Sequence, residues 1–328
     1  MPEATLRLVL FGALLLALAP FAKAGTTLEG VRTEGVLTCG LTRSEADYSK
    51  TEAHGDLASF GLDFCRAVAA ATLRDAKKIR LKSFPDEPHG LKAAGASEVA
   101  LLIGATPDAA SGKAFGVGFG SPVFDDGQGF LVNRKDGISS LADLARQQVC
   151  FISNTSAEIG LQTLSARGIR FLPFPFEEMG EMEAALVTGH CAAMTGDVSM
   201  LAVERTGFHA RANDYVILSE IIGEDPFSPA YPVGDAQWAA IVNGVTAALH
   251  EADRLGVTQA DATRMAGTGD PAGVQFSSWA PGIGRDLGLD DMWAIRVIAA
   301  VGNYGELFDR DLGAHSPLRL VRGQSVPQ

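Results

Sequence analysis

The fold is decided by residues 149–195, VCFISNTSAEIGLQTLSARGIRFLPFPFEEMGEMEAALVTGHCAAMT, where short apolar runs alternate with longer amphipathic ones. The apolar runs have the length of strands, and the segments between them carry apolar residues at helical spacing. This alternation predicts an α/β fold with a mostly parallel sheet. The expected strands are 149–152, 171–174 and 192–195, and the expected helices are 154–166 and 178–188.

The same alternation occurs earlier in the chain and predicts a separate α/β unit. About 300 mature residues exceed what one core usually serves, so we expect two lobes. We assign residues 25–130 and 220–328 to lobe I, and residues 131–219 to lobe II. The chain should cross between them near 127–133 and 216–224. The expected earlier elements are strands at 36–39, 79–84 and 99–103 and helices at 62–73 and 90–94; helices at 139–145, 198–204, 238–255 and 291–301 and a strand at 215–221 follow.

The N-terminus has the pattern of an export signal. Arg7 precedes an apolar run from Leu8 to Leu18, and the small-residue site Ala22-Lys23-Ala24 follows. We therefore predict a signal peptide at residues 1–24 and a periplasmic mature protein. No later run of eighteen apolar residues occurs in the sequence, so the mature protein should be soluble.

Charge and cysteine content restrict the function further. A net charge of -12 argues against nucleic-acid binding, which needs clustered basic residues; we expect a monomer. Four cysteines in an exported protein suggest two disulfides, with three possible connectivities. Their grouping along the chain predicts Cys39 with Cys65 and Cys150 with Cys191. No CxxC or histidine pair has metal-binding spacing, so no metal site is expected.

The sequence lacks the motifs of common enzymes. It has no GxSxG, no Walker loop, no HExxH and no GxGxxG between a strand and a helix. Its six histidines are scattered singly. We therefore predict a protein that is not an enzyme and uses no cofactor.

Several segments resemble the general L-amino-acid-binding proteins of bacterial ABC importers, which have the type II periplasmic binding fold. The resemblance covers nearly the whole mature chain, and all four cysteines fall where that family has them. It implies two α/β lobes joined by two hinge strands, with a small ligand held in the cleft between them. The matching segments are 35–40, 63–71, 126–130, 234–238, 293–296, 301–306, 316–318 and 322–323.

The resemblance also implies ligand contacts. Asp197 aligns with the aspartate that accepts hydrogen bonds from the ligand's α-ammonium group; the alternative role is a helix N-cap. Thr155 and Ser156 lie in a loop similar to the family's Gly-Thr-Thr-Thr-Glu, although Asn154 replaces the leading glycine. The alternative there is a capping box of Thr155 with Glu158. Tyr48 stands where the family has an aromatic residue over the ligand, or it is simply an exposed loop residue.

One segment departs from the family. Where the family has Arg-Asn-Thr-Thr-Trp, with an arginine that binds the α-carboxylate, this chain places Ile103 at the arginine and keeps only Thr106 of the polar set. A bidentate arginine contact contributes about 1.5–3 kcal/mol. We therefore expect weak binding of common L-amino acids, unless Arg43 supplies a guanidinium from another direction. Ile103 is otherwise a core strand residue.

These observations favour a periplasmic solute-binding component that delivers an amino acid or related compound to an inner-membrane ABC permease, with altered specificity. The alternative is a periplasmic accessory or sensor protein on the same fold. A dehydratase-like enzyme on this fold would need a second catalytic group, and none is evident.

Overall fold

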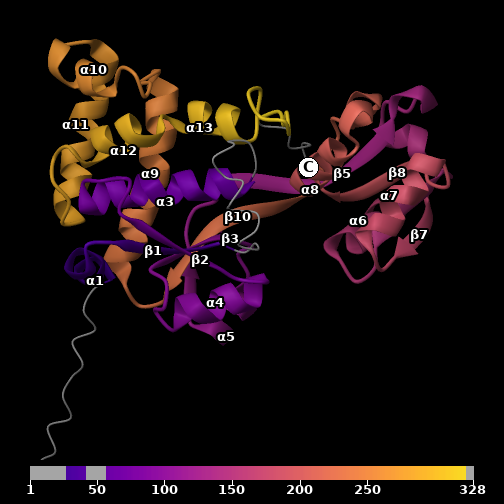
Figure 1. Ribbon diagram of the computed structural model, residues 1–328, viewed down its shortest axis with the longest axis horizontal. Coiled ribbons are helices and arrows are strands. Elements are labelled where there is room, and N and C mark those ends of the chain that lie inside the picture. The colour runs from indigo at the N-terminus through magenta and orange to yellow at the C-terminus, as the bar shows by residue number, and fades with distance from the viewer. Residues whose placement is uncertain (1–26, 42–56, 323–328) are drawn as a thin grey trace, which may run out of the picture.

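The computed structural model describes residues 27–41 and 57–322. The predicted signal peptide, Tyr48 and Arg43 lie outside these residues. Figure 1 shows two groups of helices and strands, with two long strands running between them, β5 (Phe124–Asn133) and β10 (Ile222–Pro232). The chain therefore has the expected two-lobed α/β architecture joined by two crossing strands.

In lobe I, the parallel strands β1, β2 and β3 are continued by the antiparallel strand β10, in the order β2-β1-β3-β10, and β4 also pairs with β10. Most of the helices that follow β10 pack together with α3 on one side (Figure 1). The elements are α1 Thr27–Glu34, β1 Leu37–Leu41, α3 Leu57–Leu73, β2 Ile79–Ser83, α4 Glu87–Gly95, β3 Leu101–Ala105, α5 Ala109–Phe115, β4 Val117–Phe119, α9 Ala236–Leu255, α10 Ala262–Thr268, α11 Pro271–Asp286, α12 Trp293–Val301 and α13 Tyr304–Asp311.

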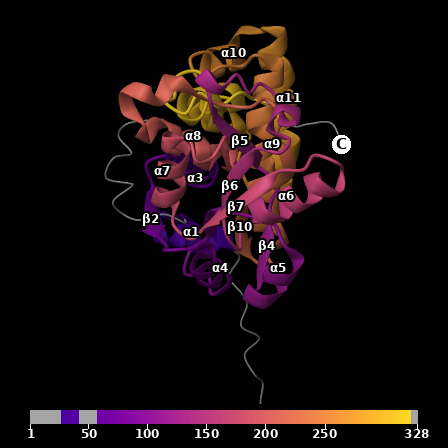
Figure 2. The ribbon, with the colours of Figure 1, turned by 90° about the vertical axis from the view of Figure 1, so that its right-hand side faces the viewer.

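In lobe II, the parallel strands β7, β6 and β8 lie beside β5, which is antiparallel to β8. Figure 2 shows α6 and α7 on opposite sides of β6 and β7. The elements are η1 Arg134–Asp136, η2 Leu141–Leu144, β6 Gln148–Ile152, α6 Ser156–Ala166, β7 Leu172–Phe176, α7 Met179–Thr188, β8 Ala193–Asp197, α8 Val198–Gly207, η3 His209–Asp214 and β9 Tyr215–Ile217.

Two expected elements differ from the structure. The helix predicted over 139–145 is one short 3-10 segment, η2. The predicted returning strand is split: β9 pairs with β5, and the crossing strand β10 begins only at Ile222. Between the two strands, the Glu220 carboxylate accepts the backbone N–H of Leu141, the first residue of η2, at 2.8 Å.

The cores follow strand periodicity, in which alternate side chains point to opposite faces. On β3, Leu101 and Ile103 pack into the large core around α3, whereas Leu102 between them packs against α4. Full burial of such a side chain contributes about 1.5–3 kcal/mol. Ile103 is 1% exposed, so it stabilises lobe I as a core residue.

Both predicted disulfides are confirmed. Cys39 in β1 is bonded to Cys65 in α3, and Cys150 in β6 is bonded to Cys191 just before β8. Each bond joins elements of one lobe, so neither links the two lobes. Across residues 27–41 and 57–322, no helix is long and apolar enough to cross a membrane.

Candidate ligand-binding cleft

Two adjoining cavities lie between the lobes, where the parallel strands have their carboxyl ends. Their volumes are about 230 Å³ and about 580 Å³, and they share Thr106, Asp197 and Asp225 in their walls. The smaller one is bounded by the ends of β1 and β3 and the start of α3, and the larger one follows α6. Ligands of open α/β sheets bind at this edge. The two cavities together are called the cleft below.

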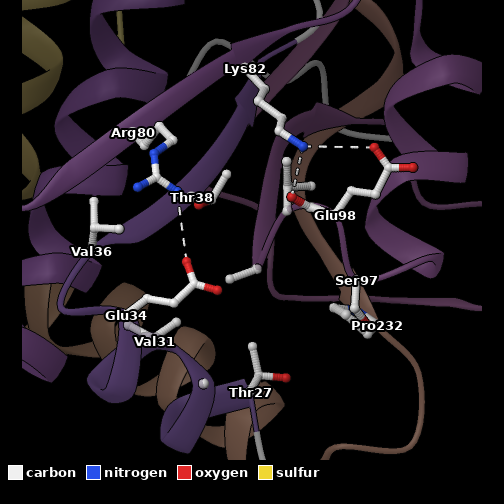
Figure 3. Close-up of a pocket in the computed structure, with 13 residues that line it drawn as sticks. Thr27, Val31, Glu34, Val36, Thr38, Arg80, Lys82, Ser97, Glu98 and Pro232 are labelled. Carbon is white, nitrogen blue, oxygen red and sulfur yellow. Dashed lines mark hydrogen bonds and ion pairs between the residues drawn. The ribbon is translucent and has the colours of Figure 1, made fainter.

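A third cavity, of about 320 Å³, lies in lobe I near the opposite end of β1 (Figure 3). Its charged side chains are paired with each other and largely exposed: Arg80 lies 3.7 Å from Glu34, and Lys82 lies 3.7 Å from Glu98. Exposed pairs of this kind contribute little energy. Because this cavity is at the amino end of the strand, it is a weaker candidate than the cleft.

Asp197 stands at the end of β8 and at the N-cap position of α8, but its side chain makes no capping hydrogen bond. The capping is supplied instead by Asp126 of the crossing strand β5. Its Oδ1 accepts the backbone N–H of Ser199 at 3.1 Å and that of Gly127 at 3.0 Å. The Asp197 carboxylate is therefore available to the cleft, which argues against the alternative role that the sequence left open.

The cleft concentrates negative charge. Burial, together with the nearby Asp126 and Asp225 carboxylates, raises the pKa of Asp197 to about 6. Burial likewise raises the pKa of Asp126 to about 6. None of the ion pairs found among the described residues includes Asp126, Asp197 or Asp225. A cation would stabilise the ionised forms of these carboxylates, so this part of the cleft is suited to a positively charged group.

On the lobe I side, the wall of the smaller cavity is apolar at Ile103. Ile103 lines the smaller cavity together with Leu41 and Leu57. The polar group nearby, Thr106, is already engaged: its hydroxyl donates to Asp225 Oδ1 at 3.0 Å, and its N–H donates to Glu87 Oε1 at 3.0 Å. This wall therefore presents no guanidinium from β3 to a ligand carboxylate.

Of the two ligand contacts predicted in the loop before α6, only one lines the cleft. Ser156 lines the larger cavity, whereas Thr155 lines neither cavity, and its hydroxyl donates to Ile152 O at 2.7 Å. The alternative capping box does not form, because Glu158 Oε2 accepts the N–H of Asn154 and Thr155 makes no side-chain capping bond. Asn154 adopts a positive φ of 61°, a conformation that asparagine tolerates better than most residues.

Gln128 of β5 is a cleft residue that sequence reasoning did not assign. Its Nε2 donates to Ala157 O at 3.0 Å and to Thr195 Oγ1 at 2.9 Å, which fixes its amide in the wall of the larger cavity. Gly160 makes room for it, because a Cβ there would lie 1.7 Å from Gln128 Oε1. Asp126 and Asp225 were missed as well. The sequence signal that could have found Asp126 and Gln128 was their place in segment 126–130, which resembles the family.

Relatives decide the family. No protein-family model matches this sequence. The chain is 34% identical over 316 residues to the general L-amino acid-binding periplasmic protein AapJ of Rhizobium johnstonii, covering 95% of this chain and 92% of that protein. This chain belongs to the periplasmic amino-acid-binding proteins of ABC importers. It is accordingly the solute-binding component of an importer and not an enzyme.

Two further relatives agree with this family. The glutamate/glutamine/aspartate/asparagine-binding protein BztA of Rhodobacter capsulatus is 31% identical, over 95% of this chain and 93% of that protein. A solved periplasmic binding protein of Brucella ovis, with glutathione bound, is 32% identical and superposes with a TM-score of 0.72, covering 91% of this chain and 94% of that one.

Proposed function

We propose that this binding protein has lost the recognition of a free α-carboxylate and takes up a solute other than the common L-amino acids. The observation that carries the proposal is the contrast within the cleft. Asp197, the carboxylate expected to hold an ammonium group, makes no ion pair with another described residue, while the position expected to hold the arginine is Ile103, a buried core residue. Burying a carboxylate beside an apolar wall leaves it partly unsatisfied, which costs binding energy.

The charge of the cleft acts in the same direction. A ligand carboxylate placed near Thr106 would approach Asp225 and Glu87, both of which already accept hydrogen bonds from that residue. Like charges at short range repel in a partly buried site. The relative from Brucella ovis with glutathione bound supports the view that members of this family also hold solutes larger than one amino acid.

The proposal includes the parts of the protein that frame the cleft. We assign residues 25–130 and 220–328 to lobe I and 131–219 to lobe II, which agrees with the crossing of β5 and β10. Thr106, Ser156 and Asp197 are proposed as ligand contacts. Tyr48 and Thr155 stay predicted ligand contacts. Because the Thr155 hydroxyl already donates to Ile152 O, Thr155 would contact a ligand through its backbone or by accepting a hydrogen bond at that hydroxyl.

Export to the periplasm by a signal peptide at residues 1–24, a monomeric state and delivery to an inner-membrane ABC permease complete the proposal. Their support is the N-terminal sequence pattern and the names of the relatives.

Calorimetry on the full mature chain tests the altered specificity. The protein is unfolded, freed of copurified solute, refolded and titrated with the twenty L-amino acids, beside the Rhizobium relative as a reference. We expect the common L-amino acids to bind this protein ten- to a hundredfold more weakly than they bind the reference, because one charge-assisted pair is absent. Equal, micromolar binding of several amino acids would contradict the proposal.

Arg43→Ala serves as the control for the one conceivable rescue. If the wild type binds amino acids and this variant does not, then Arg43 replaces the missing guanidinium. The alternative function, an accessory or sensor role without transport, is favoured by the same loss of the arginine. This alternative predicts that the lobes do not close when a small solute binds. Small-angle scattering with each bound solute would then show an unchanged radius of gyration.

A further inference from the structure

The larger cavity continues from the acidic end of the cleft along one face of α6. The residues that line it recur at helical spacing: Ser156, Ile159, Gly160, Thr163, Leu164 and Arg167. Eleven residues of helix separate the first from the last, or about 16 Å along the axis. An extended chain of three amino acids spans about 10 Å. The cavity is therefore long enough for a ligand several times the length of one amino acid.

The two ends of this cavity carry opposite charge. Asp197 and Asp225 lie where the larger cavity adjoins the smaller one, whereas Arg167 lines the larger cavity from the C-cap position of α6. The Arg167 guanidinium is exposed, and within the described chain it makes none of the hydrogen bonds or ion pairs found. Between the ends the wall is mostly apolar, with Ile159, Leu164 and Ile222. A diamine would fit the acidic end but would meet a like charge at Arg167.

The backbone on the other side of the cavity is shaped for close approach. The pairing of β10 with β5 is irregular between Ile222 and Asp225, and Gly223 lies in this irregularity with a φ of 71°. A Cβ at Gly223 would meet no atom within 4 Å, so the space beside it is open. Glycine within a strand often marks a place where another backbone comes near.

We infer that the cleft binds a short peptide of three residues, with its N-terminal ammonium at Asp197 and its C-terminal carboxylate at Arg167. The inference rests on the proposed function, since both require a cleft without an α-carboxylate site. In a peptide, the carboxyl group next to the N-terminal ammonium is a neutral amide. Loss of the arginine at position 103 with retention of Asp197 matches that chemistry. The free carboxylate of such a peptide lies at its other end, three residues away. Among the described residues, Arg167 is the only cation that lines the larger cavity, and it can meet that carboxylate.

Trialanine is a suitable probe because its side chains make small demands on the walls. Calorimetry on the ligand-free mature protein compares it with L-alanine, N-acetyl-trialanine, trialanine amide, glutathione and putrescine. We expect trialanine to bind at least tenfold tighter than each of the others, since each lacks one end, is too short, or carries an α-carboxylate beside its ammonium group. Tighter binding of L-alanine, glutathione or putrescine overturns the inference, as does undetectable binding of trialanine.

Two variants locate the ends. Arg167→Ala should weaken trialanine about tenfold or more and leave trialanine amide unchanged, because only the free carboxylate contacts the guanidinium. Equal effects on both ligands, or no effect on either, overturn the inference. Asp197→Asn should weaken trialanine and leave N-acetyl-trialanine unchanged. The matched control is Arg170→Ala, an exposed arginine outside the cavity, which should change neither ligand.

The inference and the proposed function fail separately. If trialanine does not bind but putrescine or alanine amide binds in a manner that depends on Asp197, the peptide is wrong and the altered specificity stands. If common L-amino acids bind at micromolar concentration, both are wrong. Thermal melting of every variant checks that it is folded before its binding is compared.

Discussion

At the scale of single residues, the ligand-free cleft holds carboxylates in an unfavourable state. Asp197 and Asp126 both have a pKa raised to about 6 because burial disfavours their charged forms. Above that pH they are ionised without a paired cation, and this lowers the stability of the folded protein. A cationic ligand group would stabilise the ionised carboxylates. The folded protein would therefore gain stability when such a ligand binds, and this gain would increase the affinity.

We predict that Asp197→Asn stabilises the ligand-free protein at pH 7 by on the order of 1–2 kcal/mol, after allowance for partial exposure. The sign follows from linkage: the folded pKa of about 6 lies above the unfolded value near 4, so the wild type loses stability as pH rises from about 4 to 6. Below pH 4 the advantage should vanish. Urea titrations at pH 4 and pH 7 measure it. The exposed Asp136→Asn is the control and should change little. A destabilising effect of Asp197→Asn at pH 7 would contradict this account.

At the scale of elements, the crossing strand β5 depends on close packing at its glycines. A Cβ at Gly127 would lie 2.4 Å from Ile221 Cγ2 and 3.2 Å from Gly223 O, and one at Gly129 would lie 2.7 Å from Val198 Cγ2. Neither glycine is among the described residues with positive φ. The structure indicates that these glycines let the two crossing strands and α8 approach each other.

We predict that Gly127→Ala lowers the free energy of unfolding by about 1–3 kcal/mol, the usual cost of overpacking. Ligand affinity should change with it, because the strands that must bend during closure are the ones displaced. The matched control is Gly180→Ala in α7, where a Cβ meets nothing within 4 Å and helix propensity favours alanine. Chemical unfolding of both variants decides the matter; equal effects would show that contact at Gly127 is unimportant.

The edge strand β7 illustrates another use of local sequence. Its Leu172 N–H donates to Gln147 O, toward β6, so in the alternating ladder the nitrogens of Pro173 and Pro175 face away from the sheet. Proline has no N–H to offer a further strand. The exposed edge is thereby protected from pairing with another chain, even though Leu172 is 54% exposed.

At the scale of the whole molecule, the disulfides stabilise each lobe without restricting motion between the lobes. Cys39 and Cys65 are separated by 26 residues in lobe I, and Cys150 and Cys191 by 41 in lobe II. Closure around a solute changes the angle between lobes, and only β5 and β10 cross between the two sheets to absorb it within the described chain.

We predict that Cys150→Ala together with Cys191→Ala lowers the free energy of unfolding by about 3–4 kcal/mol, the chain-entropy contribution of a loop of this size. The affinity for a cleft ligand should fall by less than threefold, because neither cysteine lines the cleft. Urea unfolding and calorimetry measure the two quantities. A large loss of affinity with little loss of stability would mean that this bond positions the binding residues.

The sequence by itself predicted the α/β alternation, the two-lobed fold and both disulfides, and it drew attention to Asp197 and Ile103. These follow from periodicity, spacing and resemblance, which are local properties of the chain. Only the tertiary structure decided that Asp126 caps α8 and frees Asp197, and that Arg167 lines the cavity that follows α6. Such arrangements bring together residues that are tens of positions apart in the sequence, and they depend on the register of the crossing strands and the orientation of a helix. No local pattern encodes them, because each is fixed by the packing of many side chains at once.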